Sequence, residues 1–120
     1  MMGWHTKEEF KVRVLEWATK LDVRVRSVAL RPMKNKWASC STSGSLSFNL
    51  DLLSMDRRVG DYVIVHELLH FSVPNHGKLW KSLMRAHLGE YEKLEAKLSD
   101  KGRAPSSAFV AQPQKNRLAQ

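Results

Sequence analysis

The chain has a single cysteine, Cys40, among its 120 residues. One cysteine cannot form an internal disulfide framework, so we expect a reducing compartment, and the cytoplasm fits best. The chain also lacks an uninterrupted apolar run of the ~18 residues that a membrane-spanning helix needs. Residues 1–3 show no basic-then-apolar leader. We therefore expect a cytoplasmic protein with one domain, because 120 residues can bury one substantial core.

Acidic residues are scarce, with 12 Asp and Glu against 20 Lys and Arg, and the net charge is +8. Half of this excess lies in residues 101–120, which hold four basic residues and no acid. That segment is rich in Pro, Ser, Gln and Ala, which predicts a disordered basic tail after a domain at 1–100. The remaining 16 basic residues face 12 acids. The charge therefore permits nucleic-acid binding but does not indicate it.

The first half of the chain predicts one helix followed by a small sheet. Thr6 is a good N-cap with Glu9 as its capping-box partner, and apolar residues then recur at helical spacing over 7–21. Three short segments show strand patterns, with a tight turn between the last two. We expect a three-stranded antiparallel sheet from residues 23–30, 36–40 and 45–49.

A second helix is expected from about Asp56 to Ser72, and it is apolar on nearly every side, which is typical of a buried helix. Pro74 ends it. A third helical stretch begins near Gly77, and Gly89 breaks it before a charged segment at 90–99. Arg57 and Arg58 open the second helix, where cations oppose the helix dipole, and the pattern offers no reason for them.

The buried helix contains the segment HELLH at residues 66–70. His66 and His70 are four residues apart, so both imidazoles leave the same face and can bind one zinc ion. Glu67 lies beside the first ligand, where it can act as a general base without binding the metal, as in the HExxH pattern of metalloproteases. Without a metal, these buried polar groups would each cost several kcal/mol of desolvation.

A catalytic zinc ion needs a third protein ligand, and two sources are open. His76 gives the spacing H-x3-H-x5-H, and Pro74 lets the chain turn back towards the metal. The alternative is a downstream acid, Glu90, Glu92 or Glu95. The chain does not have the metzincin motif, because Val73 stands where that motif requires glycine. We favour His76.

Several motifs together resemble the YgjP-like metallopeptidase family, whose relatives include the SprT-like zinc proteases. The matching segments, in order, are RPMKNKWASC at 31–40, LSFN at 46–49, HELLH at 66–70 and NHGKLW at 75–80. Departures are Ala38, where the family usually has glycine, and Gly89-Glu90, where it usually has Pro-Asp. The resemblance implies an α+β, minimal zincin-like fold, in which the small sheet packs on the HExxH helix between flanking helices.

The same resemblance implies one zinc ion bound by His66, His70 and His76, with Glu67 as the base. The expected activity is zinc-dependent hydrolysis of peptide bonds in a protein or peptide substrate, and no membrane partner is expected. An oxyanion donor is also needed. Tyr91 is the first candidate and His87 the second, although packing is the simpler explanation for each of them.

Two alternatives to an active peptidase remain open. SprT-like relatives suggest a DNA-associated zinc-containing module, and the basic tail suggests a latent enzyme whose cleft the tail covers. Structural roles are the simpler interpretation for several other residues. We expect Cys40 to be a buried small side chain and not a zinc ligand, and Trp37 and Trp80 to be core residues. An extended substrate is expected to pair with a sheet edge, for which we favour the 45–49 strand.

Overall fold

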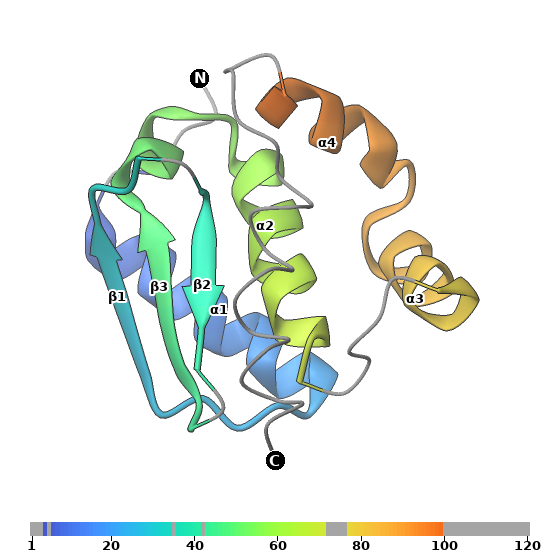
Figure 1. The fold of residues 1–120 in the computed structure, drawn as a ribbon, viewed down its shortest axis with the longest axis horizontal. Coiled ribbons are helices and arrows are strands. Elements are labelled where there is room, and N and C mark those ends of the chain that lie inside the picture. Colours follow the sequence, from blue (N-terminus) through green and yellow to red (C-terminus); the bar gives the residue numbers. More distant parts are fainter. Residues whose placement is uncertain (1–3, 5, 35, 42, 72–76, 100–120) are drawn as a thin grey trace.

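The computed structural model describes residues 4, 6–34, 36–41, 43–71 and 77–99. The described chain is α+β, with a small sheet on one side of a central helix and two helices on the other (Figure 1). In chain order the elements are α1 (Lys7–Leu21), β1 (Ser27–Arg31), β2 (Ala38–Cys40), β3 (Ser45–Asn49), the 3-10 turn η1 (Leu50–Ser54), α2 (Arg57–Leu69), α3 (Lys78–Leu88) and α4 (Tyr91–Ser99). The predicted tail, 101–120, lies outside the described residues and stays a prediction.

Helix α1 forms over the predicted residues. The hydroxyl of Thr6 accepts a hydrogen bond from the backbone N–H of Glu9 at 3.0 Å, as the capping pattern predicts. Phe10, Val14 and Trp17 are buried along one face. This face packs on β1 and on α2, so α1 passes behind the sheet and supports the central helix (Figure 1).

The sheet is mixed, and the prediction of an antiparallel sheet is wrong for one of its two pairings. β2 and β3 form the expected antiparallel hairpin, but β1 pairs with β3 in parallel, so the strand order is β1-β3-β2. β3 is consequently the central strand. The expectation that a substrate pairs along 45–49 is therefore wrong as well, because the edges belong to β1 and β2.

A buried asparagine accounts for this order. Asn49, at the end of β3, has no exposed surface, and its side-chain N–H groups donate to the carbonyls of Met33 at 3.1 Å and Lys36 at 3.0 Å. Its carbonyl oxygen accepts from the backbone N–H of Asp51. These bonds hold the β1–β2 connection across the end of β3, which leaves β3 between the two other strands.

Helix α2 is buried on all sides, as predicted. Ten of its thirteen residues are buried, including the whole run from Tyr62 to Leu69. It contacts α1, β2, η1, α3 and α4, so every neighbouring layer covers part of it. In the described part of the chain, no helix has both the length and the apolarity to cross a bilayer.

The two arginines at the start of α2 have structural partners. Arg57 donates to the carboxylate of Glu9 at 2.9 Å and lies 4.4 Å from the ring centre of Trp4. Arg58 donates to the carbonyl of Leu88 at the end of α3, at 3.4 Å. The arginines therefore link the N-terminal end of α2 to α1, to Trp4 before it and to the end of α3.

The second half of the chain follows the prediction closely. α3 begins after Gly77, and Gly89 ends it with a φ of +71°, a backbone conformation that glycine adopts readily. The charged segment beyond it forms α4, which packs on α2 through the buried residues Leu94 and Leu98. Together, α3 and α4 cover the side of α2 away from the sheet (Figure 1).

Gly60 on α2 provides a test of this packing. A Cβ atom built there would lie 2.8 Å from ring atoms of Trp4, which is too close. Alanine in a helix is otherwise favoured over glycine by about 0.5–1 kcal/mol. The clash therefore decides whether Gly60→Ala raises or lowers the free energy of unfolding. We expect Gly60→Ala to lower the free energy of unfolding by about 1–3 kcal/mol, measured by denaturant titration.

The matched control is a double-mutant cycle with Trp4→Ala, because removing the indole removes the clash. We expect the loss caused by Gly60→Ala to disappear or change sign in the Trp4→Ala background. Equal losses in both backgrounds would contradict this contact.

Candidate metal centre

The HELLH segment lies at the C-terminal end of α2. His66 and Glu67 are in the last regular turn, and His70 is the capping residue. The N–H groups of His70 and Phe71 bond to carbonyls three residues back, Glu67 at 3.2 Å and Leu68 at 3.1 Å, so the helix tightens as it ends. Regular helix therefore stops at Leu69 and not at the predicted Ser72.

His66, Glu67 and His70 all have no exposed surface. The ring centroids of His66 and His70 are 5.1 Å apart, with 65° between the ring planes. The two imidazoles thus lie side by side, as the four-residue spacing predicts. Figure 1 shows this end of α2 between the sheet and α3.

Aromatic rings surround His66. Trp80 of α3 approaches it edge-to-face with ring centroids 5.0 Å apart, and Tyr62, one turn earlier on α2, does so at 5.5 Å. Contacts on several sides leave an imidazole little room to rotate. The orientation of His66 therefore depends on α3 as well as on its own helix.

Tyr62 is itself fixed by α4. Its hydroxyl donates to the carboxylate of Glu95 at 3.1 Å, and its ring stacks on Tyr91 at 6.3 Å with 9° between the planes. Burial raises the pKa of Tyr62 above its usual value, and the negative charge of Glu95 raises it further. Tyr62 consequently remains a protonated donor to Glu95 throughout the pH range in which proteins work.

The predicted oxyanion donors lie in different places. Tyr91 is only 4% exposed and joins the aromatic cluster, contacting Tyr62 and the edge of Trp80 at 5.8 Å. Burial raises its pKa. His87 packs instead against Trp17 of α1 at 5.9 Å. Tyr91 is thus linked to the surroundings of His66, and its role as an oxyanion donor stays a prediction.

The three downstream acids each have a basic or phenolic partner. Glu90 pairs with Lys93 at 3.0 Å and Glu92 pairs with Arg85. Glu95 accepts the hydrogen bond from Tyr62. Within the described residues, no three His, Cys, Asp or Glu side chains are grouped closely enough to hold a metal ion. His76 lies outside the described residues.

The remaining predicted residues lie in the core. Cys40 is a buried thiol on β2, and Trp37 has no exposed surface. Tyr62 also contacts the site, and the sequence analysis did not predict this contact. The pattern there indicates only that the helix is apolar on nearly every side. The spacing of Tyr62 offered a signal, since residue 62 lies four before His66 and therefore on the same face.

The donor set fits a zinc ion. Zinc prefers imidazole ligands at about 2.0–2.1 Å in a tetrahedral arrangement, which places two bound rings roughly 5 Å apart, centre to centre. The separation of 5.1 Å between His66 and His70 agrees with that value. Glu67 follows His66 directly in the helix and projects from the neighbouring flank, about 100° around the axis.

Comparisons with known proteins agree with this fold. The family model described as YgjP-like, metallopeptidase domain, matches residues 3–101. The metallopeptidase zymogen of Methanocaldococcus jannaschii jannalysin superposes with a TM-score of 0.70 and 28% identity, covering 79% of this chain and 98% of its own. The metallopeptidase zymogen of Pyrococcus abyssi abylysin gives 0.69 and 17%, covering 80% and 98%. No curated protein matches the sequence.

The contact between Tyr62 and Glu95 predicts an effect on metal affinity. Tyr62→Phe keeps the ring but removes the hydroxyl that anchors it, so His66 should be held less firmly. We expect zinc to bind roughly tenfold more weakly, the low end of the range for residues that orient metal ligands. The measurement is competition with a chromophoric chelator, with the unfolding of the metal-free proteins followed in parallel.

Two controls, one on α4 and one just before it, sharpen this test. Glu95→Gln keeps an oxygen that accepts from Tyr62, so we expect near-normal zinc affinity. Loss of zinc in that variant alone would make Glu95 a ligand and contradict its supporting role. Glu90→Gln changes an exposed acid on the same side of the chain and should have no effect.

Proposed function

Because the chain belongs to the YgjP-like metallopeptidase family, we propose that it is a zinc-dependent peptidase that hydrolyses peptide bonds in proteins or peptides. The observation that carries the proposal is the complete burial of His66, Glu67 and His70 at one end of α2, with the two imidazoles side by side. Buried polar side chains are costly unless they are satisfied, and metal ligation satisfies imidazoles directly. The buried thiol of Cys40 forms no disulfide, which fits the cytoplasm that we propose as its location.

Three histidines form the proposed ligand set for one zinc ion. His66 and His70 come from α2, and His76 comes from the segment that follows it. The contacts of the acids support this choice over a downstream glutamate, since Glu90 and Glu92 form ion pairs with basic residues and Glu95 accepts from Tyr62. A set of three ligands leaves the fourth zinc position open for chemistry.

Glu67 is the proposed general base. When bound, zinc polarises the peptide carbonyl and lowers the pKa of a water molecule. The carboxylate of Glu67 accepts the proton of the attacking water and then delivers it to the leaving amine. Its burial beside His66 keeps bulk water away, so proton transfer takes place in a medium of low dielectric constant.

The edge of the sheet next to α2 is the proposed site for the substrate backbone. β2 is an edge strand among the described strands, and it contacts α2. The backbone N–H of Asn49 donates to the carbonyl of Trp37, and the N–H of Ser41 donates to the carbonyl of Ser45. Odd-numbered residues of this strand therefore bond to β3, and the residues between them do not. Ala38 therefore directs its backbone N–H and C=O away from β3. Because Ala38 has no exposed surface, an extended peptide would have to displace the atoms that cover it before pairing with these groups.

Metal content of single variants tests the ligand set. We expect one zinc per chain in the wild type by mass spectrometry under native conditions. His66→Ala and His76→Ala should lose it, because each removes a ligand, whereas Glu67→Gln should retain it. Peptidase activity should fall by about 10²–10⁴ in Glu67→Gln, the range for loss of a general base.

Each alternative outcome has a distinct meaning. Zinc retained in His76→Ala would move the third ligand to another residue and leave the peptidase proposal intact. A wild type that neither contains nor takes up zinc would contradict the proposal itself. Zinc retained with full activity in Glu67→Gln would remove the general-base role.

Tyr91→Phe tests the oxyanion donor. The change keeps the ring that stacks on Tyr62 and removes only the hydroxyl. If that hydroxyl donates to the transition state, kcat should fall about 10²- to 10³-fold with KM and zinc content little changed. That loss is the expected outcome, and a normal kcat would assign Tyr91 to packing alone.

A latent enzyme is the second candidate, because the solved structures of jannalysin and abylysin named above are those of zymogens. In this form the segment 101–120 would cover the cleft until it is removed. Full-length protein and a chain ending at residue 100 can be compared with the same peptide and equal zinc content. Greater activity of the shorter chain would support latency, and equal activity would exclude this role for the segment.

A further inference from the structure

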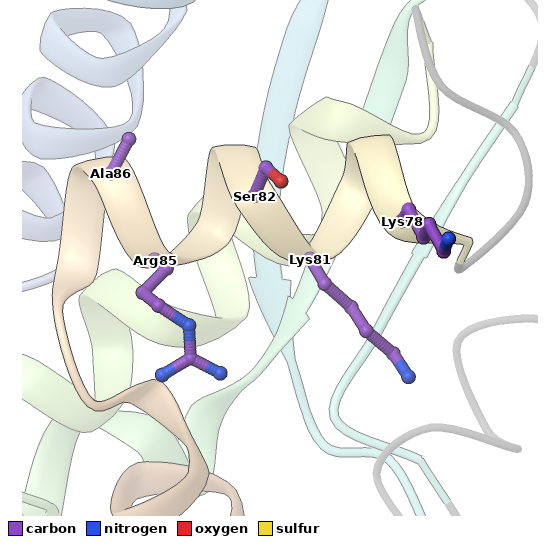
Figure 2. Close-up of a pocket in the computed structure, with 5 residues that line it drawn as sticks. All are labelled: Lys78, Lys81, Ser82, Arg85 and Ala86. Carbon is purple, nitrogen blue, oxygen red and sulfur yellow. The ribbon is translucent and has the colours of Figure 1, made fainter.

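Three basic side chains form a stripe along α3. Lys78, Lys81 and Arg85 are all exposed, and their spacing of three and four residues places them on one face over about 10 Å. They line an open hollow of about 580 Å³ together with Ser82 and Ala86. Figure 2 shows Lys81 and Arg85 extending from the same side of the helix, with Lys78 at its N-terminal end. We call Lys78, Lys81 and Arg85 the α3 basic stripe.

The charge of the stripe is only partly neutralised within the described residues. Arg85 pairs with Glu92 and lies 5.4 Å from the ring centre of Tyr91. No ion pair joins Lys78 or Lys81 to an acid in the part of the chain that the structure describes. The lysines of α4 differ, because Lys93 and Lys97 each have an acidic partner (Glu90 and Asp56). Glu92, the partner of Arg85, also attracts Lys81 over a longer distance, so the excess positive charge of α3 is greatest at Lys78 and only partly balanced at Lys81.

Helix stability does not explain these lysines. Lys78 is the first residue of α3 and Lys81 follows one turn later, whereas acids are the favoured residues at the start of a helix. The first turn of α3 contains no acid. Residues that break a local rule without a compensating contact are expected where a protein binds something else.

The stripe is close to the proposed catalytic centre. The opposite face of α3 carries Trp80, whose ring contacts His66 at 5.0 Å. A helix is about 10 Å across, and an extended peptide advances about 3.3 Å per residue. A peptide cleaved near His66 can therefore reach the stripe with side chains three or four residues from the bond that is cut.

The chemistry favours an acidic peptide over a nucleic acid. Proteins that bind single strands stack the bases on exposed aromatic rings. Here all four Trp and both Tyr side chains are buried, and the large apolar side chain exposed on α3 is Leu79. Two or three cations over 10 Å are also few for duplex binding, which commonly uses six to ten phosphate contacts. Carboxylates on a short peptide match both the number and the reach of these cations.

We propose that the α3 basic stripe binds an acidic segment of the protein substrate, so that the enzyme selects chains with Asp or Glu three or four residues from the cleaved bond. The proposal rests on the peptidase function proposed above and adds the substrate class. Exposed ion pairs change affinity about two- to fivefold each at low salt, so two of them give a preference of roughly four- to twenty-fivefold. The preference should weaken as salt is added.

The experiment uses full-length zinc-loaded protein and two fluorogenic peptides. The peptides differ only in having three Glu or three Gln around the positions three or four residues from the cleaved bond. We expect wild type to cleave the Glu peptide with the higher kcat/KM, mainly through a lower KM. The double variant Lys78→Gln/Lys81→Gln should lose the preference while cleaving the Gln peptide normally. The matched control Lys93→Gln/Lys97→Gln removes the same charge from α4 and should retain it. No preference in wild type, or equal loss in the control, would overturn the proposal.

A binding assay separates this proposal from the peptidase function. Anisotropy of the labelled Glu peptide is measured with Glu67→Gln, alone and combined with the stripe substitutions. If the stripe substitutions weaken binding but the wild type cleaves no peptide, the stripe proposal is supported and the peptidase proposal is contradicted. If the wild type cleaves the peptides but the stripe substitutions do not weaken binding, the peptidase proposal is supported and the stripe proposal is contradicted. A labelled oligothymidylate that binds more tightly than the Glu peptide, and is released by the same substitutions, would assign the stripe to nucleic acid and overturn the proposal.

Discussion

The burial of His66, Glu67 and His70 is the constraint on which the architecture depends. A helix can hide imidazoles and a carboxylate from water only if it is covered on every side, and α2 is covered by α1, by the sheet through β2, and by α3 and α4. Each of these layers therefore covers part of the helix that carries the site.

Polar contacts at the other end of α2 set how this cover is attached. The side chain of Asp61 accepts from Arg13 through both carboxylate oxygens, at 2.8 and 3.1 Å, and from the indole N–H of Trp17 at 2.9 Å. Such a two-point pair fixes direction as well as distance. Along with the contacts of Arg57 and Arg58, it orients α1 and the end of α3 against α2. The apolar contacts can then provide most of the stability without having to define the geometry alone.

The features that the sequence predicts depend on residues close together in the chain. The cap of α1 and the neighbouring imidazoles involve residues at most four apart. The burial of α2 follows from its local apolar pattern, and the break at Gly89 follows from the backbone preference of one residue. The features that it missed depend on distant pairs. Asn49 bonds to carbonyls 13 and 16 residues away and changes the sheet order, and Tyr62 meets Glu95 across 33 residues. Spacing rules carry no information about such pairs, because the fold brings them together.

Helix α3 shows how one short element can serve two purposes. Its inner face places Trp80 against His66, and its outer face carries the cations of the stripe. The helix has eleven residues, and Met84 is buried beneath it. Side chains on a helix hold their relative positions more closely than side chains on a loop. If the lysines bind a substrate segment as proposed, the position of that segment and the orientation of His66 depend on the same helix.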